Sequence, residues 1–433
     1  MKKLQKKAPV YKGELAAFLA LVFMLVLSLT SALVQSAYVR IENSRKRADT
    51  MLALESVFAE YDITLLEQYE IFVRMDMGEK PLQEKLYYYG ADEMEHQIKA
   101  VERLTDNGGA PFYAQAVQYA KQYFAAEELQ MGFSYEFSEK EDPEQQEKSV
   151  LKELEKLLQQ EEASLPEENN PISSMQAIKN SGLLAVLLPE ETSVSKQSIN
   201  RENVASVREL ATGNREFNRI FYTSDKVFFL AYIGQVFSNF ENQEEEKALL
   251  YEQEYLLNGG STDKENLETV CKKILAIRTA ANYAYLLTDQ GKQAEAEAAA
   301  VTLCSLISLP AITTLVKHAI LLAWAYGEGI VDMRVLLRNE KVPLVKTAEN
   351  WQLQLANLAA LGTGNEQTKE KPSSEGLNYN DYVRGLLLLE SKETLCMRSL
   401  DLIEINTNIK ADGYITWMEL ETERTFSTTF GYQ

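Results

Sequence analysis

The feature that most constrains this chain is an uncharged, apolar stretch near its start, from Leu15 to Val39. At about 1.5 Å of rise per residue, a helix of this length is longer than the ~30 Å hydrocarbon core of a bilayer. Lys2, Lys3, Lys6, Lys7 and Lys12 precede it, and basic residues next to a span tend to stay in the cytoplasm. We therefore expect a cytoplasmic basic tip and one transmembrane anchor over residues 1–39, with an extracytoplasmic body after Arg40.

A cleaved signal peptide is the alternative for the same stretch. Its basic start fits, but a signal core usually has only ~7–15 apolar residues and ends at a small-residue cleavage site of the A-x-A type. The stretch here is longer, and Val34-Gln35-Ser36 is the nearest approach to such a site. The pattern favours a retained anchor, and cleavage stays open.

The helix is expected to continue beyond the membrane. No Gly or Pro lies between Gly13 and Gly78, which predicts one continuous, pilin-like helix from Glu14 to about Met75. A heptad-like apolar stripe on its outer half indicates packing, either on the later helices of the chain or in a coiled coil with a partner. The stripe consists of Met51, Leu54, Phe58, Tyr61, Leu65, Tyr69 and Phe72.

Charge excludes one class of partner. The chain has 44 basic and 64 acidic residues, a net charge of −20. Such a surface repels the phosphate backbone, so we expect no nucleic acid as a partner. Helical periodicity along most of the chain, with alternation near its end, predicts a mainly α protein with a small antiparallel β-sheet (α+β).

Changes in composition along the sequence suggest five segments after the expected anchor. Residues 139–168 hold eleven acidic residues against four lysines, which predicts a mobile, exposed acidic insertion that docks on the body only through Leu183–Leu188. Within it, Ser149–Glu162 is expected as a short charged helix. The segments are a long helix with a first helical lobe (40–138), the acidic insertion (139–200), a helical body (201–361), a polar linker (362–376), and a C-terminal helix with strands (377–433).

Local patterns place further elements in these segments. Leu86–Gln130 reads as two helices broken at Asp106–Pro111, where Gly108 and Gly109 form a turn signal. Strand-like alternation marks Met131–Ser138 and Leu249–Leu257. Asp263 is expected to cap a helix that runs towards Leu287, with another helix from about Lys292.

The last third holds a second apolar stretch, from Ala298 to Val316. Its small and polar residues, and the acidic residues beside it, favour a buried helix of a soluble domain over a transmembrane hairpin. Asp381 to about Lys410 is expected as one amphipathic helix. Tyr414–Phe430 is expected as one or two strands.

Motifs for catalysis or cofactor binding were not found. The two histidines, His96 and His318, have no nucleophile elbow or metal-ligand spacing around them. Cys271, Cys304 and Cys396 form no C-x-x-C pair and no disulfide framework, and each lies in an apolar helical context. We therefore predict no catalytic residue, cofactor or metal site, and a protein that is not an enzyme.

Several stretches resemble an uncharacterised family of single-pass exported proteins of Gram-positive bacteria. They are KGELAAFLALVFMLVLSLTSALVQSAYVR, ALESVFAEYDITLLEQYEIF, YEQEYLLNGGSTDKENL, ILAIRTAANYAYLLTD, ILLAWAYGEGIVDMRVLL, KVPLVKTAENW, GLNYNDYVRGLLLL and RSLDLIEIN. Members of that family are typically encoded among components of tight-adherence (Tad/Flp) pili. The N-terminus is also similar in plan to a pseudopilin. Pilins place a Glu at the fifth position after the cleaved Gly, whereas here Phe18 is fifth after Gly13 and the acid is Glu14.

The resemblance implies location and context rather than chemistry. It suggests a membrane-anchored structural or accessory component of a pilus or surface-assembly system that acts by protein–protein packing. The alternative is a surface ligand-binding receptor or hydrolase with an unrecognised site. A deep pocket with convergent polar groups would favour that alternative.

Overall fold

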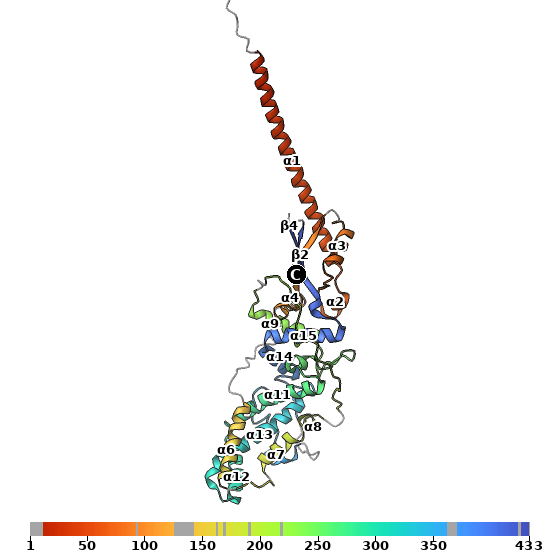
Figure 1. The fold of residues 1–433 in the computed structure, drawn as a ribbon. Helices are drawn as coiled ribbons and strands as arrows, with labels where there is room; N and C mark the ends of the chain where they lie inside the picture. Colours follow the sequence, from red (N-terminus) through yellow and green to blue (C-terminus); the bar gives the residue numbers. More distant parts are fainter. Residues whose placement is uncertain are drawn as a thin grey trace, which may run out of the picture.

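The computed structural model describes residues 12–91, 94–124, 143–161, 163–167, 170–188, 192–216, 220–361, 370–422 and 426–432. Figure 1 shows an elongated body from which one long helix, α1 (Lys12–Phe58), projects. A small antiparallel sheet lies beside the base of α1, and the remaining helices extend away from it. This arrangement confirms the predicted mainly α, α+β class with a long apolar helix at the N-terminus.

The predicted continuity of α1 to Met75 is wrong, because the helix ends at Phe58. The chain turns, and Asp62 begins the short helix α2 (Ile63–Tyr69) by accepting a hydrogen bond from the Leu65 amide at 3.1 Å. Such side-chain capping satisfies a free backbone donor and fixes a new helix start without Gly or Pro. α2 ends at Glu70 in the left-handed conformation, which turns the chain into the short strand β1 (Arg74–Met75).

The sheet joins segments from both ends of the chain. Its central strand is β3 (Tyr414–Thr422), which pairs antiparallel with β1, with β2 (His96–Arg103) and with β4 (Phe426–Gly431). The register sets Ile98 opposite Leu420 and Phe430 opposite Met418. The strands predicted between Tyr414 and Phe430 are thereby confirmed.

The predicted helix pair over Leu86–Gln130 is partly wrong. α3 (Glu79–Tyr88) and α4 (Asp106–Tyr123) are helices, but β2 lies between them. The expected break is real: Gly109 has a φ of +79°, and a Cβ there would lie 2.9 Å from the Cβ of Cys396. A side chain at that position would therefore be strained and would collide with a neighbouring helix. The strand-like stretch Met131–Ser138 lies outside the described residues.

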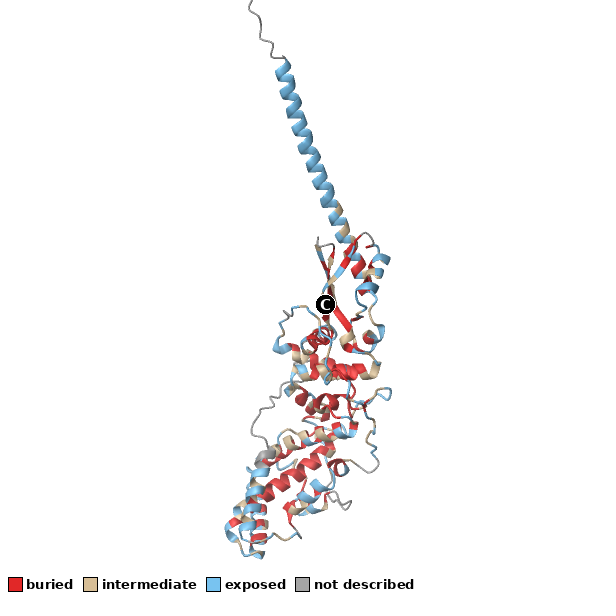
Figure 2. Ribbon diagram, viewed as in Figure 1, coloured by how far each residue is buried: buried red, intermediate tan, exposed pale blue. Residues whose placement is uncertain are grey.

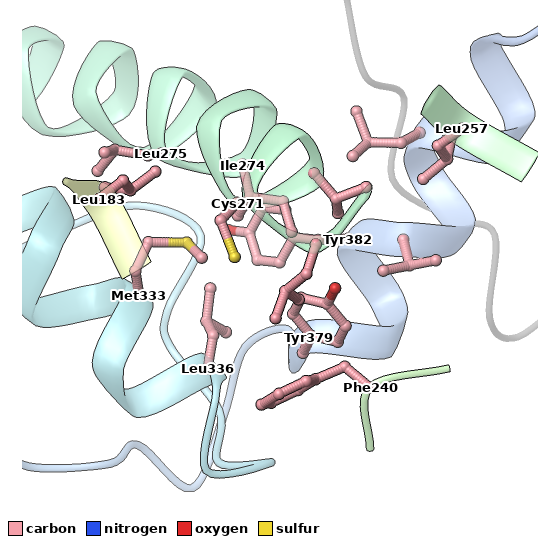
Figure 3. Close-up of a cluster of buried hydrophobic side chains, with 14 of the residues drawn as sticks. Leu183, Phe240, Leu257, Cys271, Ile274, Leu275, Met333, Leu336, Tyr379 and Tyr382 are labelled. Carbon is pink, nitrogen blue, oxygen red and sulfur yellow. The ribbon is translucent and has the colours of Figure 1, made fainter. Parts of the chain in front are cut away.

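The body is built around α13 (Thr313–Leu336), which is buried along almost all of its length after Val316. α11 (Asp263–Leu286) and α12 (Gln290–Leu306) pack against it, and the turn before α13 is a 3-10 helix, η1 (Pro310–Ile312). Figure 3 shows side chains of α11, α13 and α14 (Tyr379–Leu389) meeting in this core. The prediction of one buried helix over Ala298–Val316 is wrong: the stretch contains the end of α12, η1 and the first turn of α13, and Val301 and Leu306 are exposed.

Three boundaries in the body differ from the predictions. Leu249–Leu257 is no strand, because most of it forms the helix α10 (Glu252–Asn258). The cap of α11 is Thr262 rather than Asp263. The single helix expected from Asp381 to Lys410 is two helices, α14 and α15 (Lys392–Thr407), because Ser391 caps the second one. The helix α9 (Thr223–Val236) and the 3-10 helices η2 (Leu355–Ala360) and η3 (Ala411–Gly413) complete the body.

The acidic region is more integrated than predicted. It contains the expected charged helix, α6 (Pro143–Gln160), and also α7 (Pro171–Asn180) and α8 (Leu183–Leu187). One face of α7 is buried against α13, and α8 is buried as well. An exposed insertion is therefore the wrong description for α7 and α8, whereas most described side chains of α6 are exposed or partly exposed. Leu183–Leu187 docks on the body as expected. The buried α7 side chains are Ile172, Met175 and Ile178.

The predicted linker is described only from residue 370 onward, and 362–369 lie outside the described residues. The described part is tied to the body by isolated bridges that join Ser373 to Lys341 and Leu377 to Val342. The described end of the segment therefore lies against the body and is not a spacer between two units.

Candidate functional site

The apolar half of α1 projects from the body without contact to it. Leu15, Phe23 and Leu33 are each more than 60% exposed, and Figure 2 shows exposure continuing along the helix to its base. Among the described residues, α1 is the one helix long and apolar enough to cross a membrane. Leaving such a face in water is unfavourable by roughly 25 cal/mol per Å² of apolar surface. This half of α1 has the length and composition of a membrane span or of a signal peptide.

The last turns of α1 are held firmly by the sheet. Ala53, Leu54, Val57 and Phe58 are fully buried in a small core of their own. The other members of this core come from α3, its following loop and β3: Leu82, Leu86, Ala91, Ile415, Met418 and Leu420. Because β3 is also the central strand, α1 is joined to the middle of the sheet and not to an edge loop.

Aromatic contacts extend this junction to the end of the chain. The Phe58 ring lies 5.1 Å from that of Phe430 and 5.2 Å from that of Tyr432, measured between centroids. The Tyr432 hydroxyl donates to the Phe58 carbonyl, which is a free acceptor at the end of α1. On the opposite side, Tyr89 donates to Glu60 at 2.8 Å, and Lys85 forms an ion pair with the same carboxylate. The helix end is thus fixed from two sides.

Neither histidine has the surroundings of a catalytic base. His96 lies on β2 and not on the helix that the sequence suggested, and it is 8% exposed. Its Nδ1 is 2.9 Å from the Thr422 hydroxyl, and its Nε2 is 3.3 Å from the Ala91 carbonyl. His318 lies on α13, with its Nδ1 2.9 Å from the Tyr283 hydroxyl. Both rings therefore join neighbouring elements through hydrogen bonds.

The three cysteines are free and buried, on α11, α12 and α15. Burial raises the pKa of the Cys271 and Cys396 thiols, which makes them poor nucleophiles. Among the described residues, no group of three or more His, Cys, Asp or Glu side chains is arranged to hold a metal ion.

The sequence analysis missed a set of buried charges between α11 and α13. Arg278, Glu328, Asp332 and Lys346 have side chains with no exposed surface. Lys346 Nζ lies 2.5 Å from Glu328 and 2.7 Å from Asp332, while Arg278 pairs with Asp332. Glu328 also accepts hydrogen bonds from the Gln352 and Leu353 amides. Two acids four residues apart within an otherwise apolar helix were the available signal.

A second missed group is a pair of carboxylates with raised pKa values. Burial raises the pKa of Glu254 to about 7, and burial together with the neighbouring charges of Glu254 and Asp381 raises that of Glu241 to about 7. Glu254 accepts from the Tyr379 hydroxyl at 2.7 Å and from the Phe240 amide at 3.1 Å, both through Oε1. Within the described part of the chain, Oε2 of Glu254 and Oε1 of Glu241 are buried without a hydrogen-bond partner.

Comparison with known proteins gives a family but no activity. No curated protein and no solved structure matches the chain significantly. One family model matches residues 161–423, which include α7 to α15 and the central strand β3 but not α1. The expected membership in a family without known function is confirmed, and the association with tight-adherence pili stays a prediction. The chain belongs to the family of unknown function DUF5702.

Proposed function

We propose that this protein is a membrane-anchored structural or accessory component of a surface-assembly system and acts by packing against other proteins. In this proposal α1 spans the membrane with its N-terminus in the cytoplasm, and the body lies outside. The observation that carries the proposal is the division of α1 into two parts: an apolar half exposed along its whole length, and an end buried in the sheet. Because its end is buried in the sheet, α1 would hold the body at a fixed position relative to the membrane.

The length and flanks of α1 support a span. Residues 15–39 exceed the ~20 apolar residues that a transmembrane helix needs, and charges resume at Arg40. Five lysines precede the apolar part, whereas Arg40, Arg45, Lys46 and Arg47 follow it together with Glu42 and Asp49. The excess of basic charge is small, but it favours a cytoplasmic N-terminus. The suggested setting, a tight-adherence pilus, rests on the sequence resemblance alone.

Labelling with a membrane-impermeant maleimide tests the topology. The native cysteines are buried, so a cysteine introduced by substitution is the accessible thiol in the folded protein. Ser44→Cys, just after the apolar part, should be labelled on intact spheroplasts. Lys7→Cys should be labelled only after lysis, and Ser28→Cys in neither case. Labelling of Lys7→Cys with protection of Ser44→Cys would reverse the topology, and recovery of a secreted chain without residues 1–36 would show cleavage.

Cross-linking in intact cells tests the assembly role. A photoreactive amino acid at Leu52, which is 60% exposed on α1, should capture pilus or other surface-assembly proteins. The same probe at Leu54, which is fully buried, is the matched control and should capture only the chain itself. Cross-links from position 52 confined to lipid or to unrelated abundant proteins would contradict the proposal.

A further inference from the structure

One face of α1 stays exposed after its apolar half has ended, and Figure 2 shows this exposure reaching the base of the helix. The large side chains on this face include Ile41, which is 68% exposed, and Leu52, which is 60% exposed. We propose that the face binds the same face of α1 in a second copy of this chain, as a parallel two-helix coiled coil. The inference rests on the proposed function, because two copies anchored by α1 in one bilayer have parallel helices.

The residues on the exposed face follow a heptad repeat. Tyr38, Arg45 and Leu52 are spaced by seven residues and take position a, while Ile41 and Ala48 take position d. All five are exposed. A repeat of 3.5 residues per turn keeps one stripe of side chains against a neighbouring helix through a left-handed supercoil. The spacing therefore suits a second helix that runs beside α1.

The repeat continues into the apolar half of α1. Leu27 and Val34 take position d and Met24 takes position a, and all three are exposed. The stretch from Met24 to Leu52 spans about four heptads, which is a length at which the pattern indicates a coiled coil. The part outside the apolar half has only about two heptads. A chain that begins after the apolar half therefore keeps too little of the repeat to pair.

The exposed face and the junction with the sheet lie on different sides of α1. Leu52 and Leu54 are two residues apart, which is roughly 200° around a helix. Leu54 is fully buried in the small core that includes β3, whereas Leu52 is exposed. Pairing through the exposed face therefore leaves the contact between α1 and the sheet intact.

The charges beside the exposed face favour a second copy as its occupant. Arg45 forms ion pairs within its own helix, with Glu42 at 3.2 Å and with Asp49 at 3.5 Å. Both acids take position e, which flanks the contact between two helices. When two copies pair, the two arginines therefore meet among four carboxylates. The other basic residues of this stretch take positions b and c, away from the contact: Arg40, Lys46 and Arg47.

Arg45 also fixes the alignment of the two helices. A polar residue at a single a position specifies register, because it avoids an apolar partner. The two copies of Arg45 lie at the same level only when the helices are parallel and unshifted. This is the arrangement that anchoring in one bilayer imposes.

Cysteine cross-linking of the full chain in native membranes tests the proposal. The native cysteines are buried, so an introduced cysteine is the accessible thiol. With copper phenanthroline as oxidant, Ile41→Cys and Ala48→Cys should form disulfide-linked dimers at least about fivefold faster than Asn43→Cys. Asn43 is the matched control, because it is exposed close to Ile41 but takes position f, on the side opposite the contact. Co-expression of two differently tagged copies should give dimers that carry both tags.

Substitution of Arg45 in the Ile41→Cys background tests the role of charge. Arg45→Glu adds two acids to the four already beside the contact and should slow dimer formation at least about tenfold. Arg45→Leu places an apolar residue at position a and should speed it. Equal rates for Ile41→Cys and Asn43→Cys, no dimer from either, or equal rates for Arg45→Glu and Arg45→Leu would overturn the proposal. Loss of the span by cleavage is read separately, as a faster-migrating chain on a reducing gel.

Discussion

Arg278 on α11 and Asp332 on α13 form an ion pair with both side chains fully buried, and Nη2 and Nε of the arginine lie 2.9 Å and 3.1 Å from the same carboxylate oxygen. The guanidinium also donates to the Pro343 and Leu344 carbonyls, so one side chain fixes two helices and the loop after α13. Burial alone would lower the pKa of Arg278, but Asp332 and Tyr382 raise it above its usual value. The guanidinium of Arg278 therefore stays charged inside the core.

Arg278→Met should destabilise the protein by about 3–5 kcal/mol, because it removes one of the two cationic partners of buried Asp332 and takes a donor from the Pro343 and Leu344 carbonyls. The free energy of unfolding, from urea denaturation of the full chain in mild detergent, measures this cost. Arg338→Met is the control, since Arg338 is 40% exposed and its ion pair with Glu340 lies at the surface. We expect about 1 kcal/mol or less there. Equal effects of the two variants would show that the buried pair contributes no more than a surface pair.

Glu254 should make the protein less stable as the pH rises towards neutrality. Its pKa is raised from 4.5 to about 7 in the folded state, so the folded state binds the proton more tightly than the unfolded state does. The associated stabilisation is fully present below about pH 4.5 and is lost as the pH rises through about 7. Between pH 5 and 8, the unfolding free energy of the native chain should therefore fall relative to that of Glu254→Gln, by at most about 3 kcal/mol.

Two further variants check that result. The double variant Glu241→Gln/Glu254→Gln should have a still flatter profile, since the pKa of Glu241 is raised in the same direction. Asp289→Asn should leave the profile between pH 5 and 8 unchanged, because the Tyr285 hydroxyl lowers the pKa of Asp289 and its contribution is lost only in acid. Parallel profiles for the native chain and Glu254→Gln would contradict a raised pKa for Glu254.

Elements whose sequence pattern fits only one type of secondary structure were predictable from the sequence. The uncharged run after Leu15 could only be helix, and the pattern after Asp263 gave α11 nearly in full. The end of α1 could not be located, because no Gly or Pro marks it, and a single capping residue, Asp62, decides where the next helix begins. The sequence predicted helix for β2, because buried and exposed positions alternate only weakly along it. The strand conformation of β2 depends on pairing with β3, which is more than 300 residues away in the sequence.

The candidate sites were harder to predict because they depend on contacts between distant segments. Glu328 and Asp332 stood out as acids in an apolar helix, but their partners Arg278 and Lys346 come from elsewhere in the chain. A cavity between α6, α7 and α11 also joins segments that are distant in the sequence. The hydrogen bonds of His96 to Thr422 and of His318 to Tyr283 likewise connect segments that are far apart in the sequence, so no local motif could indicate them.

Phe58→Ala should cost about 3–5 kcal/mol, since Phe58 is fully buried between α1 and the ends of β3 and β4. The loss of its ring contacts with Phe430 and Tyr432 should also loosen the junction between α1 and the sheet. Urea denaturation measures the first effect, and hydrogen exchange of the β4 amides measures the second. Leu52→Ala, at an exposed position on the same helix, should change stability by no more than about 0.5 kcal/mol. Equal stability of both variants would mean that the end of α1 is only loosely attached.

Shortening the chain separates packing of α1 on the body from a role as a simple stalk. A protein that begins at Asn43 retains the buried residues Ala53, Leu54, Val57 and Phe58, and it should be soluble, monomeric and folded. A protein that begins at Gly78 loses these residues together with α2 and β1, which leaves the apolar faces of Leu86 and Met418 uncovered. It should aggregate or unfold at lower temperature, as size-exclusion chromatography and thermal denaturation would show. If the shorter protein is monomeric and equally stable, the sheet does not need α1, and the buried contacts at the end of α1 contribute little to the fold.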